Sequence, residues 1–377
     1  MEREMDPLMG AMPLHGIKVI DATSNIAGPF GGAILGDLGA DVIKIERPQG
    51  DPARSMVPLE DSRSAYFHIV NRNKDLLTID LKSASGRASF YELLADADVF
   101  ISNFLPHQLS ELGLTPETMR TDFPKLIIGN LSSYGQVGND ANRPGYDATI
   151  QARTGIMAIT GETNGEPVRT GVSVLDMGAG TWLALGVLAA LVKRERFGEG
   201  CIIETSLYET GVTWVSYHLS SFQISQQPSR RVGAAHPTFS PYGLFEAQDG
   251  KVCIGVGSDI VFKRLTEIIE RPELFEDPRF NTNEGRVNNR ALLNSEIESA
   301  LVDHPVSHWV EKLGQGGVPV DALRLPEDLL NDSQAHELEM LLPNPDPNSK
   351  VKLIPAIPLR LNGVRPPIRK SAPKNRR

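Results

Sequence analysis

The sequence predicts an α/β protein with a parallel sheet in a large domain, followed by a small α/β domain. Strand and helix patterns alternate through the first half of the chain, which is typical of a parallel sheet. A length of 377 residues is more than one hydrophobic core usually serves. The segment 227–241 is rich in Pro, Ser, Gly and Ala, as linkers and loops are. We therefore expect a large domain over 1–225, a small domain over 226–325, and a segment 326–377 that returns to the large domain.

The first strand–helix–strand unit lies between residues 17 and 46. The apolar run at 17–21 (IKVID) predicts a short buried strand, and the small residues Ala27-Gly28-Pro29 predict the turn that follows it. A helix over 30–38 is expected to end at Gly39, and 41–46 (DVIKIE) predicts a second strand. Because a helix joins the two strands, they are expected to pair in parallel.

The same alternation continues to residue 206. Strands are predicted at 76–80, 99–102, 126–131 and 202–206, and helices at 83–95 and 116–120. A long Ala- and Leu-rich helix over 178–195 ends at basic residues and Gly198, and another helix is expected over 207–226. Together these elements predict a doubly wound, Rossmann-like large domain.

The small domain is predicted from a hairpin followed by helices. Strands at 244–247 and 252–256 flank Gln248-Asp249-Gly250, and Asp-Gly is a strong signal for a hairpin turn. Helices are predicted near 260–269, 288–302 and 307–313. The segment 353–361 has strand character and is the part expected to return to the large domain.

The composition argues against several classes of function. A net charge of −9 disfavours a broad nucleic-acid surface. Two cysteines without CxxC spacing, and scattered histidines, indicate neither a disulfide framework nor a metal site. The longest apolar stretch, 182–192, is shorter than the roughly 20 residues of a membrane helix, and the first ten residues lack a signal-peptide pattern. We expect a cytoplasmic protein that binds no membrane, with a solvated basic tail at 369–377.

Among acidic residues, Asp176 is the strongest candidate for chemistry. The chain has no P-loop, no GxSxG elbow and no HExxH helix, and AGPFGG after the first strand is not the GxGxxG of nicotinamide enzymes. Asp176 lies in VSVLDMGAG, directly before the predicted long helix. From spacing alone, an Asp there is usually a helix N-cap. The other interpretation is a nucleophilic carboxylate, held ionised by free backbone N–H groups and flanked by small residues.

Six segments, in order, resemble one family. They are VIDATSNIAGP, GADVIKIERPQGDPAR, NRNKDLLTIDLKSASG, DVFISNFLP, YDATIQARTGIMAITG and GVSVLDMGAGTWLALGVLAALVKRERFGEG. Together they are similar to the family III CoA-transferase superfamily, which includes formyl-CoA:oxalate and crotonobetainyl-CoA:carnitine CoA-transferases and α-methylacyl-CoA racemase. The resemblance implies CoA transfer from an acyl-CoA donor to a carboxylic acid acceptor, with no tightly bound cofactor. It also implies an interlocked homodimer with active sites between the subunits.

The resemblance also assigns roles to residues. Asp176 matches the family's nucleophile, which forms an acyl anhydride and then an aspartyl-CoA thioester. CoA carries phosphates, which bind cations. Arg47 is expected at the adenine nucleotide and Lys74 near a phosphate, while Arg72 either assists or forms a surface ion pair. An arginine that some members carry in this region is Glu111 here. The matching CoA-binding residues are Ile26, Ala27, Arg47, Asn71, Arg72, Lys74, Asn103 and Phe104.

The acyl pocket is expected to involve Tyr146, Asp147, Arg169, His236 and Tyr242. His236 and Tyr242 lie where some members carry a substrate loop, and packing between domains explains them equally well. Arg153 and Arg169 suggest a dicarboxylic acid, unless they pair with nearby carboxylates.

Two other functions are alternatives to transfer. A racemase of this fold uses a His–Asp acid–base pair, and this chain has Tyr146 where the racemase motif carries histidine. A tyrosine with a pKa of about 10 is a poor base at neutral pH, which favours transfer. A non-catalytic acyl-CoA-binding subunit would not need a nucleophile, and Asp176 within an intact motif argues against it.

Overall fold

The structure, a computed structural model, describes residues 12–61 and 63–374 and divides into two units. Unit 1 comprises Met1–Ile156, Thr170–Ile224 and Leu330–Arg377, and unit 2 comprises Met157–Arg169 and Ser225–Leu329. The first ten residues, for which the sequence predicted no signal peptide, lie outside the described residues.

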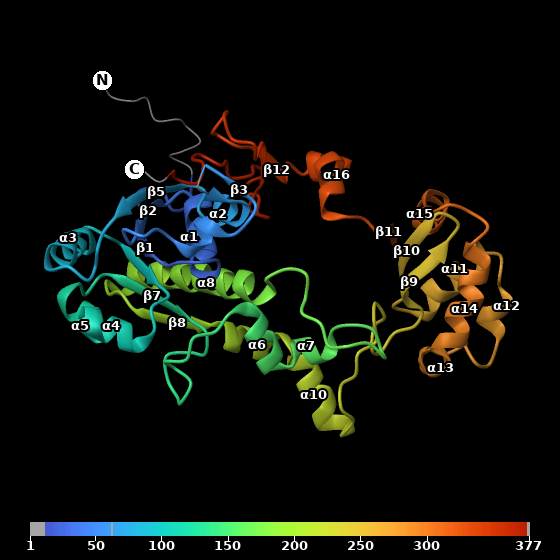
Figure 1. Ribbon diagram of the computed structural model, residues 1–377. Coiled ribbons are helices and arrows are strands. Elements are labelled where there is room, and N and C mark those ends of the chain that lie inside the picture. The colour runs from blue at the N-terminus through green and yellow to red at the C-terminus, as the bar shows by residue number, and fades with distance from the viewer. Residues whose placement is uncertain (1–11, 62, 375–377) are drawn as a thin grey trace. The chain divides into compact units, whose positions relative to one another are not determined.

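Unit 1 is built on a six-stranded parallel sheet (Figure 1). Its strands are β1 (Lys18–Ala22), β2 (Asp41–Glu46), β5 (Lys74–Thr78), β6 (Val99–Ser102), β7 (Ile127–Ser132) and β8 (Ile202–Ser206). They lie in the order β5-β2-β1-β6-β7-β8, and Val19 of β1 pairs with both Val42 and Val99. The winding reverses between β1 and β6, and ligands of such sheets bind outside the carboxyl ends of the strands at that point. The predicted doubly wound α/β architecture is confirmed.

Helices pack on both faces of this sheet. They are α1 (Ala27–Asp37), α3 (Ala84–Ala95), α4 (Pro106–Leu112), α5 (Pro116–Asp122) and α8 (Val174–Phe197). Ile20, Phe90, Phe100 and Ile128 belong to an apolar cluster between one face and α3–α5. On the other face α8 packs against β7, and α1 packs against α8. The two helices approach closely at glycines, since a Cβ on Gly180 would lie 2.4 Å from the Ala27 carbonyl oxygen.

Short elements complete unit 1 and its boundaries. The helices are α2 (Ala65–Val70), α6 (Asp147–Thr154), α7 (Ile156–Ile159), α9 (Leu207–Trp214), α10 (Ser216–Ser225), α16 (Ser333–Glu337) and the 3₁₀ helices η1 (Pro52–Ser55) and η2 (Pro326–Asn331). The strand pairs are β3 (Leu59–Glu60) with β4 (Arg63–Ser64), and β12 (Leu341–Pro343) with β13 (Leu353–Pro355). The predicted helix 207–226 is thus interrupted at Val215, and the predicted strand 353–361 is only three residues long.

Helix α8 is long and apolar enough to cross a membrane by length and composition alone. The prediction that no segment reaches this length was wrong, because the count stopped at Thr181 and Lys193, whereas a span tolerates a few polar residues. In unit 1 this helix packs against α1, β7, β8 and α9, and Leu175, Leu183 and Val187 are fully buried. Trp182, Leu185 and Val192 are 42–55% exposed, so this packing buries one side of the helix.

The basic tail is docked rather than solvated over its described part. Asn73 Oδ1 accepts hydrogen bonds from the backbone N–H groups of Arg369 (2.6 Å) and Lys370 (2.9 Å). The Asn73 N–H donates in return to the Lys370 carbonyl at 2.9 Å. Ala372 is buried and packs against Ala53 and Phe67. The prediction of a solvated tail failed because it was based on the charged side chains, whereas the backbone of 369–373 makes most of the contacts. Residues 375–377 lie outside the described residues.

Unit 2 is an antiparallel sheet covered by helices. The strands are β9 (Tyr242–Ala247), β10 (Gly250–Gly255) and β11 (Val320–Ala322), in the order β11-β10-β9. The helices are α11 (Asp259–Ile268), α12 (Glu273–Glu276), α13 (Asn283–Asn288), α14 (Arg290–Leu301) and α15 (Val306–Gln315). Phe245, Ile254, Phe262, Leu293 and Trp309 are among its buried core. The predicted hairpin is present, with Ala247 paired to Gly250 across the turn.

One segment of unit 2 was placed in the large domain by the sequence. Residues 157–169 pack with unit 2, although they precede α8 in the chain. The Arg231 guanidinium donates hydrogen bonds to the backbone carbonyls of Ala158 (3.2 Å), Glu162 (3.3 Å) and Gly165 (2.8 Å). A single side chain therefore ties this segment to residues about 65–75 positions later, which local patterns do not reveal.

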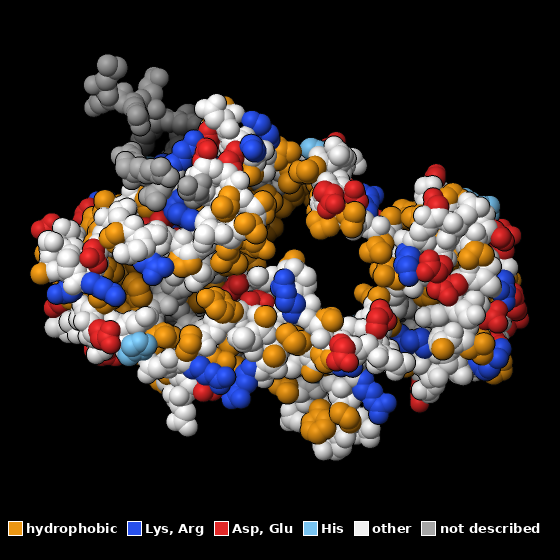
Figure 2. Space-filling view, viewed as in Figure 1, with side chains coloured by type: hydrophobic (Ala, Val, Ile, Leu, Met, Phe, Trp, Pro, Cys, Tyr) orange, Lys and Arg blue, Asp and Glu red, His pale blue; other side chains and the backbone are white. Residues whose placement is uncertain are grey.

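The surface carries both signs of charge. In the view of Figure 2, Lys and Arg side chains are interspersed with Asp and Glu on each unit. Large apolar side chains are exposed on α9 and α10, where Trp214, Tyr217, Leu219 and Phe222 are 41–48% exposed. Such clustering is unusual for a surface that faces only water.

Candidate active site

A small pocket lies at the carboxyl ends of β1, β6 and β7, where the winding of the sheet reverses. It has a volume of about 100 Å³. Its walls come from the loop after β1, the loops after β6 and β7, the start of α6 and the first turn of α8. The lining residues are Ser24, Asn25, Ile26, Ala27, Met56, Asn103, Leu105, Leu131, Ser132, Ser133, Gly145, Tyr146, Asp176 and Leu207.

Five residues that the sequence singled out meet in this pocket. They are Ile26, Ala27, Asn103, Tyr146 and Asp176, which come from four separate segments of the chain. Parallel strands bring their carboxyl ends to one edge of the sheet, so loops distant in sequence converge there. The pocket therefore joins the predicted nucleophile to part of the predicted CoA-binding set.

The surroundings of Asp176 differ from both sequence interpretations. Helix α8 begins at Val174, so Asp176 lies inside the first turn instead of before it. The Oδ2 atom of Asp147 accepts hydrogen bonds from the backbone N–H groups of Leu175 (2.8 Å) and Asp176 (3.2 Å). Asp147, not Asp176, is therefore the carboxylate that caps this helix.

The expectation that N–H groups hold Asp176 ionised is consequently wrong. Those donors are taken by Asp147, and among the described residues none donates a hydrogen bond to the Asp176 carboxylate. Burial, and next the negative charge of Asp147, raise the pKa of Asp176 to about 7. A group with this pKa is part ionised at neutral pH, which suits a carboxylate that must lose its proton to react.

Asp147 is a buried residue under the start of α8 and does not line the pocket. The sequence placed it in the substrate pocket, but its side chain is 6% exposed. Its Oδ1 atom accepts a hydrogen bond from Gln151 Nε2, and Gln151 also bonds Thr170 through Nε2 and Oε1, both at 3.0 Å. Asp147 and Gln151 stand one turn apart on α6, so together they fix the segment that leads into α8.

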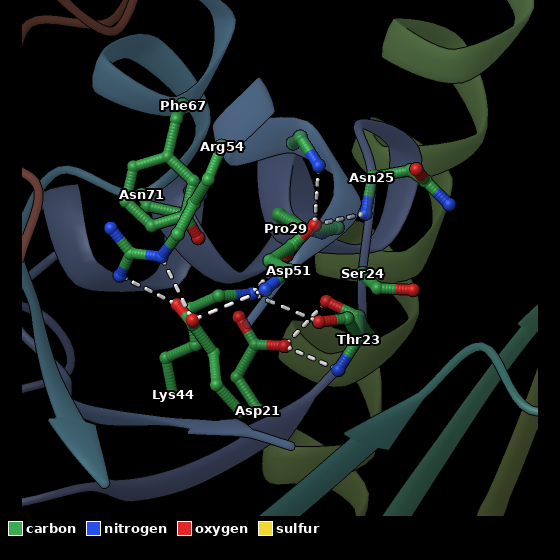
Figure 3. A network of polar contacts seen from close by, with 12 residues as sticks. Asp21, Thr23, Ser24, Asn25, Pro29, Lys44, Asp51, Arg54, Phe67 and Asn71 are labelled. Carbon is green, nitrogen blue, oxygen red and sulfur yellow. Dashed lines mark hydrogen bonds and ion pairs between the residues drawn. The ribbon is translucent and has the colours of Figure 1, made fainter. Parts of the chain in front are cut away.

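The loop after β1 is held by side chains from separate elements (Figure 3). Asn103 clamps Ser24 with two bonds, accepting from its N–H (3.0 Å) and donating to its carbonyl (2.9 Å). Asp51 Oδ1 accepts from the Asn25 N–H at 3.1 Å, and Lys44 Nζ donates to the Thr23 carbonyl at 3.0 Å.

Lys44 and Asp51 also form an ion pair of 2.7 Å whose side chains are both buried. Asp51 Oδ1 accepts a further bond from the Ala53 N–H at 2.9 Å, so its carboxylate joins the pocket loop to η1. The sequence assigned no role to these two residues. The lysine inside the apolar strand DVIKIE could have indicated this pair, because a buried lysine needs a buried carboxylate.

Two of the cations expected at CoA phosphates are committed to interior ion pairs. Lys74 Nζ lies 2.7 Å from Asp21 Oδ2 and also donates to the Pro29 carbonyl (2.7 Å) and to Asn71 Oδ1 (3.1 Å). Burial lowers the pKa of Lys74 to about 8. Arg72 forms an ion pair with Asp37 at 2.5 Å, and this pair is buried, whereas the sequence interpretation left open a CoA contact or a surface ion pair. In this structure Asn71, Arg72 and Lys74 present no exposed group to a phosphate.

Arg47 is the exposed member of the predicted cations. Its Nε donates to the Gly50 carbonyl at 3.0 Å, which leaves the terminal guanidinium nitrogens toward solvent. Phe104 is half-buried and packs against the apolar cluster under β1 and β6, outside the pocket lining. The exposed side chain of Glu111 lies on α4.

The remaining candidates lie elsewhere. Arg153 forms an exposed ion pair with Asp140 at 3.4 Å and does not line the pocket. Arg169, His236 and Tyr242 belong to unit 2. There the rings of His236 and Tyr242 pack with centroids 5.4 Å apart, and burial, with the nearby charge of Arg290, lowers the pKa of His236.

Comparison with known proteins agrees with these features. The sequence matches the model of CoA-transferase family III over residues 14–376. Acetyl-CoA:oxalate CoA-transferase of Acetobacter aceti is 36% identical over 374 residues, which cover 98% of this chain and 95% of that protein. Succinyl-CoA:glutarate CoA-transferase of Mus musculus is 36% identical over 324 residues, which cover 85% of this chain and 74% of that protein.

The fold agrees with that of a solved relative. The crystal structure of a CAIB/BAIF family protein from Brucella suis matches with a TM-score of 0.85 and 33% identity, over 96% of each chain. Agreement in sequence and in fold over nearly the whole length, around a pocket that holds Asp176, shows that this chain belongs to CoA-transferase family III.

Proposed function

We propose that this CoA-transferase moves CoA between small dicarboxylic acids and that Asp176 is its nucleophile. The supporting observation is the position of the Asp176 side chain, which lines the pocket at the reversal point of the sheet. Among the described residues, none donates a hydrogen bond to its carboxylate, so both oxygens are available to attack an acyl carbon. A carboxylate is a weak nucleophile, and binding the thioester beside it raises the effective concentration enough to compensate.

The first half of the reaction transfers CoA to the enzyme. The Asp176 carboxylate attacks the thioester carbon of the donor, the C–S bond breaks, and CoA leaves as a thiolate. The product on the enzyme is a mixed aspartyl-acyl anhydride. The thiolate then attacks the aspartyl carbon of this anhydride, which releases the donor acid as a carboxylate and leaves an aspartyl-CoA thioester.

The second half runs the same chemistry in reverse order with the acceptor. The acceptor carboxylate attacks the aspartyl-CoA carbon and expels the thiolate, which forms a new anhydride. The thiolate attacks the acceptor's acyl carbon, which gives the new acyl-CoA and the free Asp176 carboxylate. The first attack requires the Asp176 carboxylate without its proton, and a pKa of about 7 supplies that form near neutral pH.

The adenine nucleotide of CoA is proposed to lie at Arg47. This exposed guanidinium stands on the loop between β2 and η1, and the Arg47 side chain binds the Gly50 carbonyl of the same loop. Asp51 follows directly and holds the pocket loop through the Asn25 N–H. A ligand whose phosphates bind Arg47 is therefore anchored next to the loop that lines the Asp176 pocket.

The dicarboxylic substrate class rests on the named relatives and on the pocket. Their names contain oxalate, succinyl-CoA and glutarate, which are dicarboxylic acids or carry a second carboxylate. The pocket volume of about 100 Å³ corresponds to roughly three waters, at about 30 Å³ for each in the liquid, which favours a short acid.

A homodimer is proposed as the working form. The resemblance implies a homodimer. The exposed apolar side chains of α9 and α10 support it, because packing against a second subunit would remove them from water. Native mass spectrometry at micromolar protein concentration tests this point. A single species of 41.2 kDa would contradict it.

Trapping the first intermediate tests the proposed mechanism. The protein is mixed with acyl-CoA and hydroxylamine, digested and read by mass spectrometry. A hydroxamate on Asp176 is expected in the wild type and in the control Asp303→Asn, an exposed position on unit 2. Asp176→Asn should form none. Unmodified wild-type protein that still binds acyl-CoA would support the non-catalytic alternative.

The racemase alternative has its own readout. Tyr146, at the position where the racemase motif carries histidine, lines the pocket and is 71% exposed. Incubation of a 2-methylacyl-CoA with enzyme in D₂O, without an acceptor acid, should give no deuterium at the α-carbon. Incorporation at a rate similar to CoA transfer would favour the racemase.

A further inference from the structure

The loop after β1 has a fixed backbone. Its Thr23, Ser24 and Asn25 backbone groups bind Lys44, Asn103 and Asp51, and Asp21 Oδ1 also accepts from the Thr23 N–H at 2.9 Å. Asn25 adopts a φ of 66°, a left-handed conformation that Asn and Gly tolerate better than other residues. The side chains of this loop are therefore held at defined positions before any ligand arrives.

Two polar side chains of this loop face the pocket without partners. Ser24 and Asn25 both line it together with Asp176, and both are half-buried. Among residues 12–61 and 63–374, none makes a hydrogen bond to the Ser24 hydroxyl or to the Asn25 side-chain amide. In Figure 3 the Asn25 amide points away from the network that holds its own backbone. Fixed, half-buried and unpaired donors are characteristic of a binding site.

The charges of the residues that line the pocket limit which chemical group it can bind. Among the described residues that line this pocket there is no Lys, Arg or His, and Asp176 is its acidic member. A second carboxylate in so small a space would be repelled by ionised Asp176 unless donors hold it. A carboxylate accepts hydrogen bonds only, and a Ser hydroxyl and an Asn amide supply one and two donors.

We propose that Ser24 and Asn25 bind the non-reacting carboxylate of the dicarboxylic acid while its other carboxyl group reacts at Asp176. This inference rests on the proposed function and identifies the residues that select the acid. The neutral donors hold the distal carboxylate on a rigid loop, so the reacting end is positioned without a counter-cation beside the nucleophile.

The test compares two acids of equal carbon number, glutarate and pentanoate, as acceptors. The variants are Ser24→Ala and Asn25→Gly, the second chosen because glycine keeps the φ of 66° while it removes the amide. Each should lower the ratio of kcat/KM for glutarate to that for pentanoate by about 10- to 100-fold, because a hydrogen bond to a charged group is lost. Asn25→Asp should lower this ratio further, since it adds a negative charge.

The matched control is Asn362→Gly, at an exposed position outside the pocket lining that has a φ of 50°. This control should keep the wild-type ratio, and thermal melting should show all variants folded. Equal losses for both acids in the Ser24 and Asn25 variants would overturn the proposal, as would a rise in KM for acyl-CoA alone. A wild-type enzyme that used glutarate and pentanoate equally well would overturn it too.

Failure of the proposed function has a separate signature. If the wild type forms no hydroxamate on Asp176 in the trapping experiment, the mechanism is wrong whatever the acid ratios are. If the hydroxamate forms and the ratios do not change, the mechanism stands and the assignment of Ser24 and Asn25 is wrong.

Discussion

Asp147 and Asp176 share the start of one helix: the backbone N–H of Asp176 donates to Asp147 Oδ2 at 3.2 Å. One carboxylate thus takes the donors that a helix start offers, and the other stays in the pocket without them. The division gives the two residues opposite properties. Asp147 is anchored, and Asp176 has a raised pKa and free oxygens.

Removing the nucleophile should abolish transfer. Asp176→Asn is expected to lower kcat by at least about 10³-fold, because an amide cannot form the anhydride. Steady-state assays of CoA exchange measure this loss. A correctly folded Asp176→Asn protein with wild-type turnover would contradict the mechanism.

The same substitution should stabilise the fold at alkaline pH. The folded pKa of Asp176, about 7, is above its ordinary value of 3.8, so the native state binds the proton more tightly than the unfolded state. Relative to its stability below about pH 4, the wild type therefore loses at most about 4 kcal/mol as pH rises from about 4 to about 7, and the loss stays constant above that. Urea unfolding at pH 8 should show Asp176→Asn more stable than the wild type. Equal stability of the two proteins would show that Asp176 is not desolvated.

Activity should follow the ionisation of Asp176. In the wild type, kcat/KM is expected to fall as pH drops below about 7, because the protonated carboxyl does not attack. Asp147→Asn removes a nearby negative charge while keeping an acceptor oxygen, so the acidic limb should move to lower pH. Asp176 remains buried in this variant, so the pKa of Asp176 read from the pH profile should still be above the ordinary value of an aspartate. Asp140→Asn changes a partly exposed residue outside the pocket lining, and this control should leave the pH dependence of kcat/KM as in the wild type.

The Lys44–Asp51 pair should support both stability and the pocket loop. Lys44→Met alone leaves Asp51 buried and unpaired, at a cost of about 3–5 kcal/mol in urea unfolding. Adding Asp51→Asn should recover much of that stability but not the activity, because the pocket loop still lacks the Lys44 hydrogen bond to the Thr23 carbonyl.

The control for this experiment is the Arg72–Asp37 pair, which is equally buried. Arg72→Met with Asp37→Asn should lower stability without changing kcat, since neither residue lines the pocket. A rise in KM for acyl-CoA in this control would instead support the family-based assignment of Arg72 to CoA binding.

Docking of the C-terminal segment should depend on Asn73. Asn73→Gly keeps the left-handed backbone, with φ at 59°, and removes the oxygen that accepts from Arg369 and Lys370. We expect a loss of about 1–3 kcal/mol of unfolding free energy, because two partly buried backbone donors lose their partner. Limited proteolysis should cut the segment faster than in the wild type. An unchanged cleavage rate would show that other contacts hold it.

Local sequence patterns predicted the sheet strands well and the helix ends less well. Alternation of apolar runs and helices located β1, β2, β6, β7 and β8 within one or two residues. The sequence placed the start of α8 at 178 because glycines are common in loops. In the structure, glycine at this end of α8 allows the helix to pack closely against α1. Within the candidate site, the sequence patterns and the family resemblance together identified Asp176 and four other residues that line the pocket.

By itself the sequence determined the order of strands and helices, the family, and the residue at the start of the long helix that lines the pocket. Only the tertiary structure decided the partner of each charge. Asp147 caps α8 from 28 residues away, and Lys74 pairs with Asp21 from 53 residues away. The physical reason is that spacing along the chain encodes periodicity and turns, while the state of a charged side chain depends on burial and on contacts that long-range folding creates.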